Sequence, residues 1–356
     1  MKRLLLLLTF FVFSKTYSQQ YYTIIGKVLD TLQQPLSGAS VFAQNTTIGT
    51  AANTAGEFKI YLPDGGYNLI FTVAGYQTQS IQVSNNNKEP LTIILKPKEK
   101  EMGEVVIQNS NEVADGWQKY GKFFTENFIG TSHNAEKCTL QNPEALKFLF
   151  IKKKNKLKVL GKEDLIINNN ELGYRIRYKL DSFMYEYNTD MSGFLGYPFY
   201  EEMEGSDSLK AVWKKNREKA YYGSRLHFMR SYYDSSLTEE GFVLEMKDTL
   251  PGSAKYLPIT NPYDTSFYNI LDSANVEIGF PDEVKVIYKK ARADDKFLAA
   301  NKYPKGTPNQ TSALTVRNYF IIQENGFFFP QTAVVNTGYW TWKKLADMLP
   351  YDYYPE

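Results

Sequence analysis

The stretch GEFKIYLPDGGYNLIFTVAGY, Gly56–Tyr76, indicates how the N-terminal part of the chain folds. Its first half alternates apolar and polar residues, which places Phe58, Ile60 and Leu62 on one side. Its second half alternates in the same way, and a period of two is typical of half-buried strands. The Pro-Asp-Gly-Gly sequence between them supplies glycines, for which a positive φ costs little. The stretch therefore predicts two strands joined by a tight turn.

Five further runs around this stretch have the same character. They are YTIIGKVLD, LSGASVFAQ and TTIGTAAN before it and SIQV and LTIIL after it, at residues 22–30, 36–44, 46–53, 80–83 and 91–95. About seven short strands separated by Gly, Pro, Asn and Asp predict an all-β, transthyretin- or immunoglobulin-like sandwich over residues 19–97. We expect that segment to fold alone. The residues predicted to face its core are Val28, Val41, Phe58, Leu69 and Phe71.

Several residues of this segment also occur at the spacing of a known family. They are Gly26, Val28, Asp30, Pro35, Leu36, Gly38, Ala39, Val41, Thr47, Gly49, Gly56, Phe58, Gly75 and Tyr76. With them, residues 22–97 resemble the carboxypeptidase-like regulatory domain, although Asn53 stands where that family usually has Asp. The resemblance implies a transthyretin-like spacer or attachment unit of exported proteins, without chemistry of its own. It also implies a relation to TonB-dependent outer-membrane transporters, many of which begin with such a domain.

The first 18 residues have the features of a secretory signal peptide. Lys2 and Arg3 precede an apolar run at residues 4–13, and small residues stand just before Gln19. An apolar run of this length is too short to span a membrane. We therefore expect an exported protein that begins near Gln19 and is periplasmic, outer-membrane associated or secreted. The later sequence predicts no transmembrane span.

Charge and cysteine content narrow the classes of function. Removal of residues 1–18 takes away three of the 41 basic residues and none of the 39 acidic ones, so the mature net charge is −1. A nearly neutral protein has no general attraction to phosphate backbones, which argues against nucleic acid as a partner. Cys138 is the one cysteine, so no internal disulfide can form. We interpret it as a buried small hydrophobe rather than a catalytic thiol.

The composition changes after the sandwich. Residues 98–112 are charged and poor in core residues, and we interpret them as a linker. From residue 113 a helical stripe of aromatic residues, strand-like runs and a helix over 207–233, bent at Gly223–Ser224, predict an α+β domain. We expect this domain, residues 113–356, to contain an antiparallel sheet and one long helix. Its sequence resembles an uncharacterised region that accompanies the regulatory domain in bacterial exported proteins, and this resemblance implies no activity.

A zinc site is the first chemical alternative. His133 and Glu136 have the His-x-x-Glu spacing of zinc carboxypeptidases, and His227 is the one further histidine that could complete the site. The motif is short and arises often by chance. In the peptidases the regulatory domain follows the catalytic domain, whereas here it comes first, and the sequence lacks βαβ alternation. We therefore predict no metal, no cofactor and no catalytic residue, with these three as the candidates if a metal binds.

Partner binding is the alternative that the second region favours. The helix over 207–233 carries aromatic and basic residues, of which Trp213, Tyr221, Tyr222 and Arg225 are candidate contacts, although aromatic residues at this spacing are more often core. The sequence thus predicts a non-enzymatic envelope protein whose C-terminal domain binds an envelope protein or a glycan. Two alternatives stay open: a zinc metallocarboxypeptidase-like hydrolase, and an accessory subunit of a TonB-dependent outer-membrane transporter.

Overall fold

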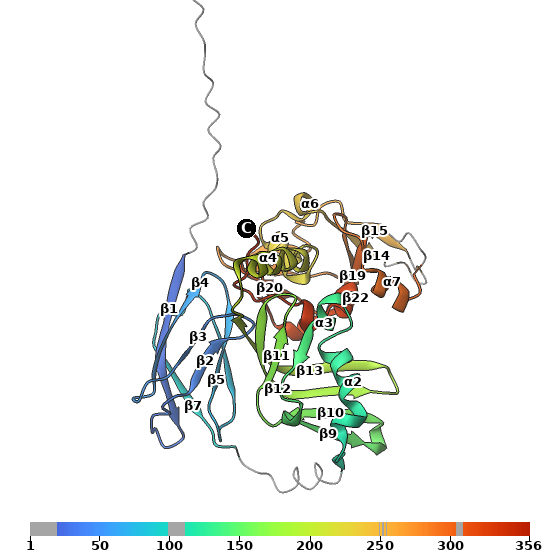
Figure 1. Cartoon of the computed structure of the whole chain (residues 1–356). Coiled ribbons are helices and arrows are strands. Elements are labelled where there is room, and N and C mark those ends of the chain that lie inside the picture. Colours follow the sequence, from blue (N-terminus) through green and yellow to red (C-terminus); the bar gives the residue numbers. More distant parts are fainter. Residues whose placement is uncertain (1–19, 99–110, 249, 251–252, 254, 304–308) are drawn as a thin grey trace, which may run out of the picture.

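The computed structural model describes residues 20–98, 111–248, 250, 253, 255–303 and 309–356 (Figure 1). The expected signal peptide and its cleavage point, together with most of the expected linker, lie outside these residues. Among the residues described, no helix combines the length and apolar character needed to cross a membrane.

The N-terminal part is a β-sandwich, as the alternating sequence predicts (Figure 1). Its strands are β1 (Tyr21–Asp30), β2 (Ser40–Ala43), β3 (Gly49–Ala51), β4 (Glu57–Pro63), β5 (Tyr67–Thr72), β6 (Gln79–Val83) and β7 (Leu91–Leu95). One sheet has the order β4-β1-β7, in which β1 and β7 are parallel, and the other has the order β3-β2-β5-β6. All five predicted core residues are buried, with at most 4% of their surface exposed. The prediction of a sandwich with about seven strands is confirmed.

A six-stranded antiparallel sheet follows. It comprises β8 (Cys138–Leu140), β9 (Leu146–Ile151), β10 (Lys156–Gly161), β11 (Leu165–Asn169), β12 (Tyr174–Glu186) and β13 (Met191–Glu202), in the order β8-β11-β12-β10-β9 with β13 paired to β12. The helices α2 (Gly116–Phe128) and α3 (His133–Glu136) and the short 3-10 turns η1 (Pro143–Ala145) and η2 (Lys152–Lys154) accompany it. Phe124 and Phe128 of α2 pack into the core of this unit, whereas Trp117 remains 38% exposed.

The predicted long helix is two helices, α4 (Asp207–Tyr221) and α5 (Arg225–Tyr233). The chain breaks where the sequence predicted a bend. Gly223 has a φ of +81°, a left-handed conformation that continues no helix, and a Cβ there would lie 2.6 Å from the Tyr288 ring. Ser224 then caps α5, because its hydroxyl accepts a hydrogen bond from the backbone N–H of His227 at 3.1 Å.

The rest of the chain forms two more antiparallel sheets, so the second region has antiparallel sheets with few helices (Figure 1). The strands are β14 (Phe242–Lys247), β15 (Tyr256–Pro258), β16 (Tyr268–Ile270), β17 (Val276–Ile278), β18 (Val284–Tyr288), β19 (Gln310–Val316), β20 (Phe320–Ile322), β21 (Phe328–Phe329) and β22 (Val334–Gly338). The sheet orders are β15-β14-β18-β19-β22 and β16-β17-β20-β21. The helices are α6 (Leu237–Glu240), α7 (Asp295–Ala300) and α8 (Tyr339–Trp342), with 3-10 turns η3 (Gln331–Ala333) and η4 (Leu345–Asp347).

Two apolar runs of the sequence each divide between different sheets. The run ALTVRNYFIIQ bends at residues 317–319, so that β19 and β20 pair in different sheets. The run FFFPQTAVV is interrupted after β21 by Pro330 and the turn η3. Proline lacks the N–H that a continuous strand needs, which explains the second interruption.

The C-terminal segment, residues 349–356, joins the sandwich to the second region. The backbone N–H of Tyr351 donates to the carbonyl of Asn45 at 2.7 Å, and the Asp352 carboxylate accepts the backbone N–H of Thr47 at 3.1 Å. Tyr351 and Phe327 both belong to the buried core of the sandwich. The core of the N-terminal unit is therefore completed by residues from near the end of the chain.

The glycines of the Pro-Asp-Gly-Gly turn take part in the same contact. Gly65 has a φ of +123°, and a Cβ on it would lie 2.4 Å from the side chain of Asn325. A Cβ on Gly66 would lie 1.6 Å from Gln323 Oε1. The side-chain amide of Asn325 donates to the carbonyl of Gly66 at 2.9 Å. These glycines thus let a distant turn approach the sandwich backbone, besides forming the local turn.

Candidate functional site

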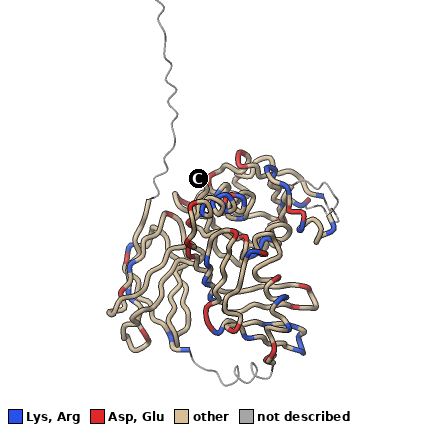
Figure 2. Tube along the Cα trace, viewed as in Figure 1, with Lys and Arg blue, Asp and Glu red and all other residues tan. Residues whose placement is uncertain are grey.

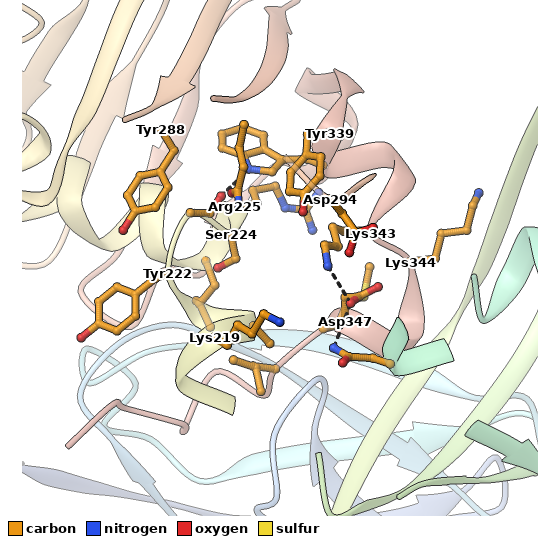
Figure 3. Close-up of a pocket in the computed structure, with 18 of the residues that line it drawn as sticks. Lys219, Tyr222, Ser224, Arg225, Tyr288, Asp294, Tyr339, Lys343, Lys344 and Asp347 are labelled. Carbon is orange, nitrogen blue, oxygen red and sulfur yellow. Dashed lines mark hydrogen bonds and ion pairs between the residues drawn. The ribbon is translucent and has the colours of Figure 1, made fainter. Parts of the chain in front are cut away.

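A cleft of about 1030 Å³ lies where the six-stranded sheet unit meets the helices and sheets that follow it (Figure 3). The first unit contributes residues of α3 and β13. The other side comes from the end of α4, the start of α5, the segment 288–296, α8 and η4. Figure 2 shows that Lys and Arg gather along α4, beside this region. The cleft is thus assembled from segments that lie more than 200 residues apart in the sequence.

Charged side chains of both signs line the cleft, and its acidic side chains have partners within the protein. Glu171 accepts a hydrogen bond from the side chain of Asn216 at 3.0 Å. Asp347 pairs with Lys343 at 3.0 Å, and Asp295 pairs with Arg292 at 3.0 Å. Asp294 caps α7, because its side chain accepts the backbone N–H of Lys296 at 2.9 Å. The acidic groups therefore hold the walls together rather than offer charge to a ligand.

Four cations of the cleft have no carboxylate partner among the residues that the structure describes: Lys219, Arg225, Lys290 and Lys344. Of these, Lys290 donates a hydrogen bond to the backbone carbonyl of Glu239 at 2.6 Å. Arg225 is half-buried, with its guanidinium 5.3 Å from the centre of the Phe328 ring. In Figure 3 the side chains of Lys219 and Arg225 extend toward the middle of the cleft, whereas Lys344 lies at its far edge. Burial lowers the pKa of Lys344, because a partly desolvated ammonium without a counter-charge is disfavoured.

The floor of the cleft contains a buried carboxylate. Asp347 is 6% exposed, and its Oδ1 accepts a hydrogen bond from the Asn134 side chain at 2.9 Å as well as the ion pair with Lys343. Burial is the largest influence on the pKa of Lys343 and would lower it, but Asp347, Tyr339 and Asp294 together raise it. The hydrogen bond from Asn134 to Asp347 fixes η4 against α3.

Aromatic residues form one wall. Tyr222 is 42% exposed, whereas Tyr288, Tyr339 and Trp340 are buried behind the surface. The indole N–H of Trp340 donates to the carbonyl of Gly223 at 2.9 Å, which fixes α8 against the break between α4 and α5. Of these four rings, Tyr222 is therefore the one that a ligand can reach, on a wall that buried rings hold rigid.

The structure does not bring the three candidate metal ligands together. His133 lies in the cleft wall, 3.6 Å from Glu136 and 3.6 Å from Glu171, and Glu136 also pairs with Lys296. His227 is a buried residue of α5, and its Nδ1 accepts the N–H of Gly223 at 3.1 Å while its Nε2 lies 3.0 Å from Glu240. Within the described part of the chain, no group of three or more His, Cys, Asp or Glu is placed to hold a metal ion.

The environment of His227 predicts a pH dependence of stability. Burial lowers its pKa from the usual 6.5, against the opposing effect of Glu240. Below about pH 6.5, His227 takes up a proton in the unfolded chain but not in the folded chain. The free energy of unfolding therefore decreases as the pH falls, until the pH is below the pKa of His227 in the folded chain. In a His227→Gln variant, the decrease in the free energy of unfolding that is due to His227 is expected to be absent. Denaturant titrations of both proteins between about pH 5 and 8 test this, and a constant difference across that range would contradict it.

The four candidate partner contacts divide into two pairs. Trp213 and Tyr221 are buried, 4% and 6% exposed, so both stabilise the fold and a partner cannot reach them. The Trp213 indole N–H donates to the carbonyl of Asn170 at 2.9 Å, which ties α4 to the end of β11. Tyr222 and Arg225 line the cleft. The periodicity placed all four on one helix, whereas the break at Gly223 puts Arg225 on α5 and leaves the other three on α4 or at its end.

Three further residues of the cleft, Lys343, Lys344 and Asp347, were not predicted from the sequence. Their only local signal is the run WTWKKLAD, in which two tryptophans precede two lysines and a carboxylate follows. Cys138 was interpreted as a buried small hydrophobe rather than a catalytic thiol, and in the structure it is half-buried and packs against the core of the six-stranded sheet unit. Burial raises the pKa of its thiol to about 12, so the thiol is protonated at neutral pH and is a poor nucleophile.

Comparisons with known proteins support the assignment of the N-terminal domain. Residues 24–107 match the CarboxypepD_reg-like domain, which confirms the resemblance of the N-terminal part. A stretch of 110 residues is 30% identical to the TonB-dependent receptor SusC of Bacteroides thetaiotaomicron; it covers 31% of this chain and 10% of that protein. The chain thus spans about a tenth of the length of that relative.

The structure was also compared with solved structures. One of those found is a DUF3823 family protein from Bacteroides ovatus, 13% identical, which covers 52% of this chain and 83% of its own. The TM-score is 0.19, a value that establishes no shared fold.

Proposed function

We propose that the chain is an exported, non-catalytic protein of the cell envelope whose cleft binds a saccharide. The observation that carries the proposal is the cleft, a concavity of about 1030 Å³ lined by amide, hydroxyl, aromatic and cationic groups. Pockets of ~300–1000 Å³ suit a small ligand or a short polymer segment. A specific protein partner usually needs a broad face, with roughly 1200–2000 Å² buried in total. The geometry therefore favours a glycan over a protein.

The location and the absence of catalysis rest on other observations. The expected signal peptide and the similarity to a TonB-dependent receptor support an envelope protein. The matched domain is of a regulatory-like kind, which supports a role in binding rather than catalysis. In this proposal the chain consists of a signal peptide (1–18), the sandwich (19–97), a linker (98–112) and the ligand-binding region (113–356). The sandwich supports that region rigidly, through the contacts of the C-terminal segment.

A panel of short oligosaccharides tests the proposal on the purified mature chain. We expect at least one sugar to raise the melting temperature in a saturable way and to remain intact by mass spectrometry. A Tyr222→Ala change should weaken that binding by about tenfold, as loss of a central aromatic contact usually does. Tyr61→Ala is the matched control, because Tyr61 is 55% exposed on the sandwich, away from the cleft. Cleavage of the sugar, or equal affinity of both variants, would contradict the proposal.

An accessory subunit of a TonB-dependent transporter is the second candidate, because the similarity to SusC favours it specifically. The same panel separates the two functions. If no sugar binds, and a pull-down from envelope extract recovers a transporter through the sandwich, the second candidate replaces the first.

A further inference from the structure

The charge balance of the cleft indicates the kind of ligand that it takes. Its carboxylates have partners within the protein: Asp347 pairs with Lys343, Asp295 pairs with Arg292, Asp294 caps α7, and Glu171 accepts a hydrogen bond from Asn216. One oxygen, Oδ2 of Asp347, is buried without a hydrogen-bond partner among the described residues. Lys219 and Arg225 have no such partner among the described residues, and both extend into the cleft (Figure 3). The cleft therefore has positive charge that the folded chain does not neutralise.

Arg225 is the more informative of the two. An exposed lysine needs no partner, because water solvates it. Arg225 is half-buried, its guanidinium carbon lies over the Phe328 ring at 5.3 Å from the ring centre, and no hydrogen bond to another described residue uses its five N–H donors. A planar fork whose donors are unused matches the two oxygens of a carboxylate.

A second feature of the cleft favours a ligand that carries hydroxyl groups. The side-chain oxygen Oδ1 of Asn336 is buried, lines the cleft and has no hydrogen-bond partner among the described residues. An unsatisfied acceptor in a partly dry site gains most from a donor on the ligand. Together with the exposed ring of Tyr222, on which a sugar face can pack, it favours a polyhydroxylated ligand.

We propose that the ligand is an acidic saccharide, a sugar that carries a carboxylate, bound with this group against Arg225 and Lys219 and with hydroxyls toward Asn336. The inference rests on the proposed function and narrows it. Lys344, at the far edge of the cleft, provides a second cation for a neighbouring acidic unit.

Calorimetric titration of the full mature chain with the trimer of galacturonic acid tests the inference. The methyl ester of the trimer has the same size without the charge, and we expect it to bind at least tenfold more weakly. Arg225→Gln should weaken binding of the acid trimer by about tenfold or more, since a charge-assisted hydrogen bond is lost. Lys219→Gln should cost about threefold, as for an exposed charge. Lys215→Gln, on the same helix but outside the cleft lining, is the control and should change the affinity by less than about twofold.

Measurements on the unmodified chain keep the test independent of how the variants fold. Binding of the acid trimer should weaken as NaCl rises, while binding of the ester should not. If the ester binds as tightly as the acid, the ligand need not be acidic, which contradicts the inference but leaves the proposed saccharide function in place. If triglutamate binds as tightly as the acid trimer, the cleft recognises negative charge alone, and the inference that the ligand is a sugar is wrong. If no sugar binds, both proposals fail.

Discussion

Replacing Arg230 with methionine is expected to lower the free energy of unfolding by about 3–5 kcal/mol. The side chain is 4% exposed and donates to three backbone carbonyls, those of Asn325 at 3.1 Å, Tyr353 at 2.8 Å and Tyr351 at 2.9 Å. Its guanidinium also lies over the Tyr354 ring, 3.9 Å from the centre. Methionine keeps much of the volume but leaves buried carbonyls without donors.

Arg225→Met is the matched control for this prediction. Both arginines lie on α5, but Arg225 makes no such hydrogen bonds, so its loss should cost less than about 1 kcal/mol. Denaturant unfolding of the two variants gives the comparison. Equal destabilisation would show that Arg230 does not anchor the C-terminal segment, and the contacts between the segment and the sandwich would then lack the role described for them.

Replacing Phe327 with alanine is expected to destabilise the sandwich, although Phe327 is more than 200 residues away in the sequence from the strands it covers. Phe327 is 2% exposed and packs in the same core as Phe58 and Tyr67. A buried phenylalanine usually contributes about 3–5 kcal/mol relative to alanine. The same cost is expected for Phe58→Ala, within the sandwich itself.

Hydrogen exchange at the amides of β4 and β5 is the appropriate measurement. If the core is shared, Phe327→Ala should speed exchange there, as Phe58→Ala does, and the isolated segment 19–98 should be less stable than the sandwich within the whole chain. The exposed Tyr319→Ala variant is the control and should leave these amides unchanged. If Phe327→Ala leaves the exchange rates of the β4 and β5 amides unchanged, the sandwich is stable without residues of the second region, as the sequence suggests.

Local patterns in the sequence predicted local features of the fold. The alternation from Phe58 to Leu62 needs no distant residue to be interpreted, because a half-buried strand imposes it directly. The break between α4 and α5 was also predictable, since Gly223 and Ser224 act on their own backbone. In contrast, the division of ALTVRNYFIIQ into β19 and β20 depends on which strands lie beside each half, and the sequence carries no local signal for this.

The candidate site was only partly predictable for the same reason. Tyr222 and Arg225 stood out because they lie on an aromatic and basic helix. Lys344 and Asp347 did not, since their importance comes from folding η4 against α3. The zinc hypothesis joined His133 and His227 by residue type alone, and tertiary structure gives the two residues different surroundings.

The packing of the second region against the sandwich was also only partly predictable from the sequence. Its glycines were interpreted as turn residues, and Gly65 and Gly66 are also the places where Asn325 and Gln323 approach the backbone. The resemblance to a spacer domain predicts the strands of the sandwich but not the residues of the second region that pack into its core. The structure adds a shared core that ties the sandwich to the region with the cleft.

A crystal structure of the mature chain with the tightest-binding sugar of the panel is the decisive measurement for saccharide binding in the cleft. We expect an intact sugar in the cleft, in contact with Tyr222 and with an acidic group against Arg225. A sugar bound on the sandwich or elsewhere on the surface, or a cleaved sugar in the cleft, would contradict it.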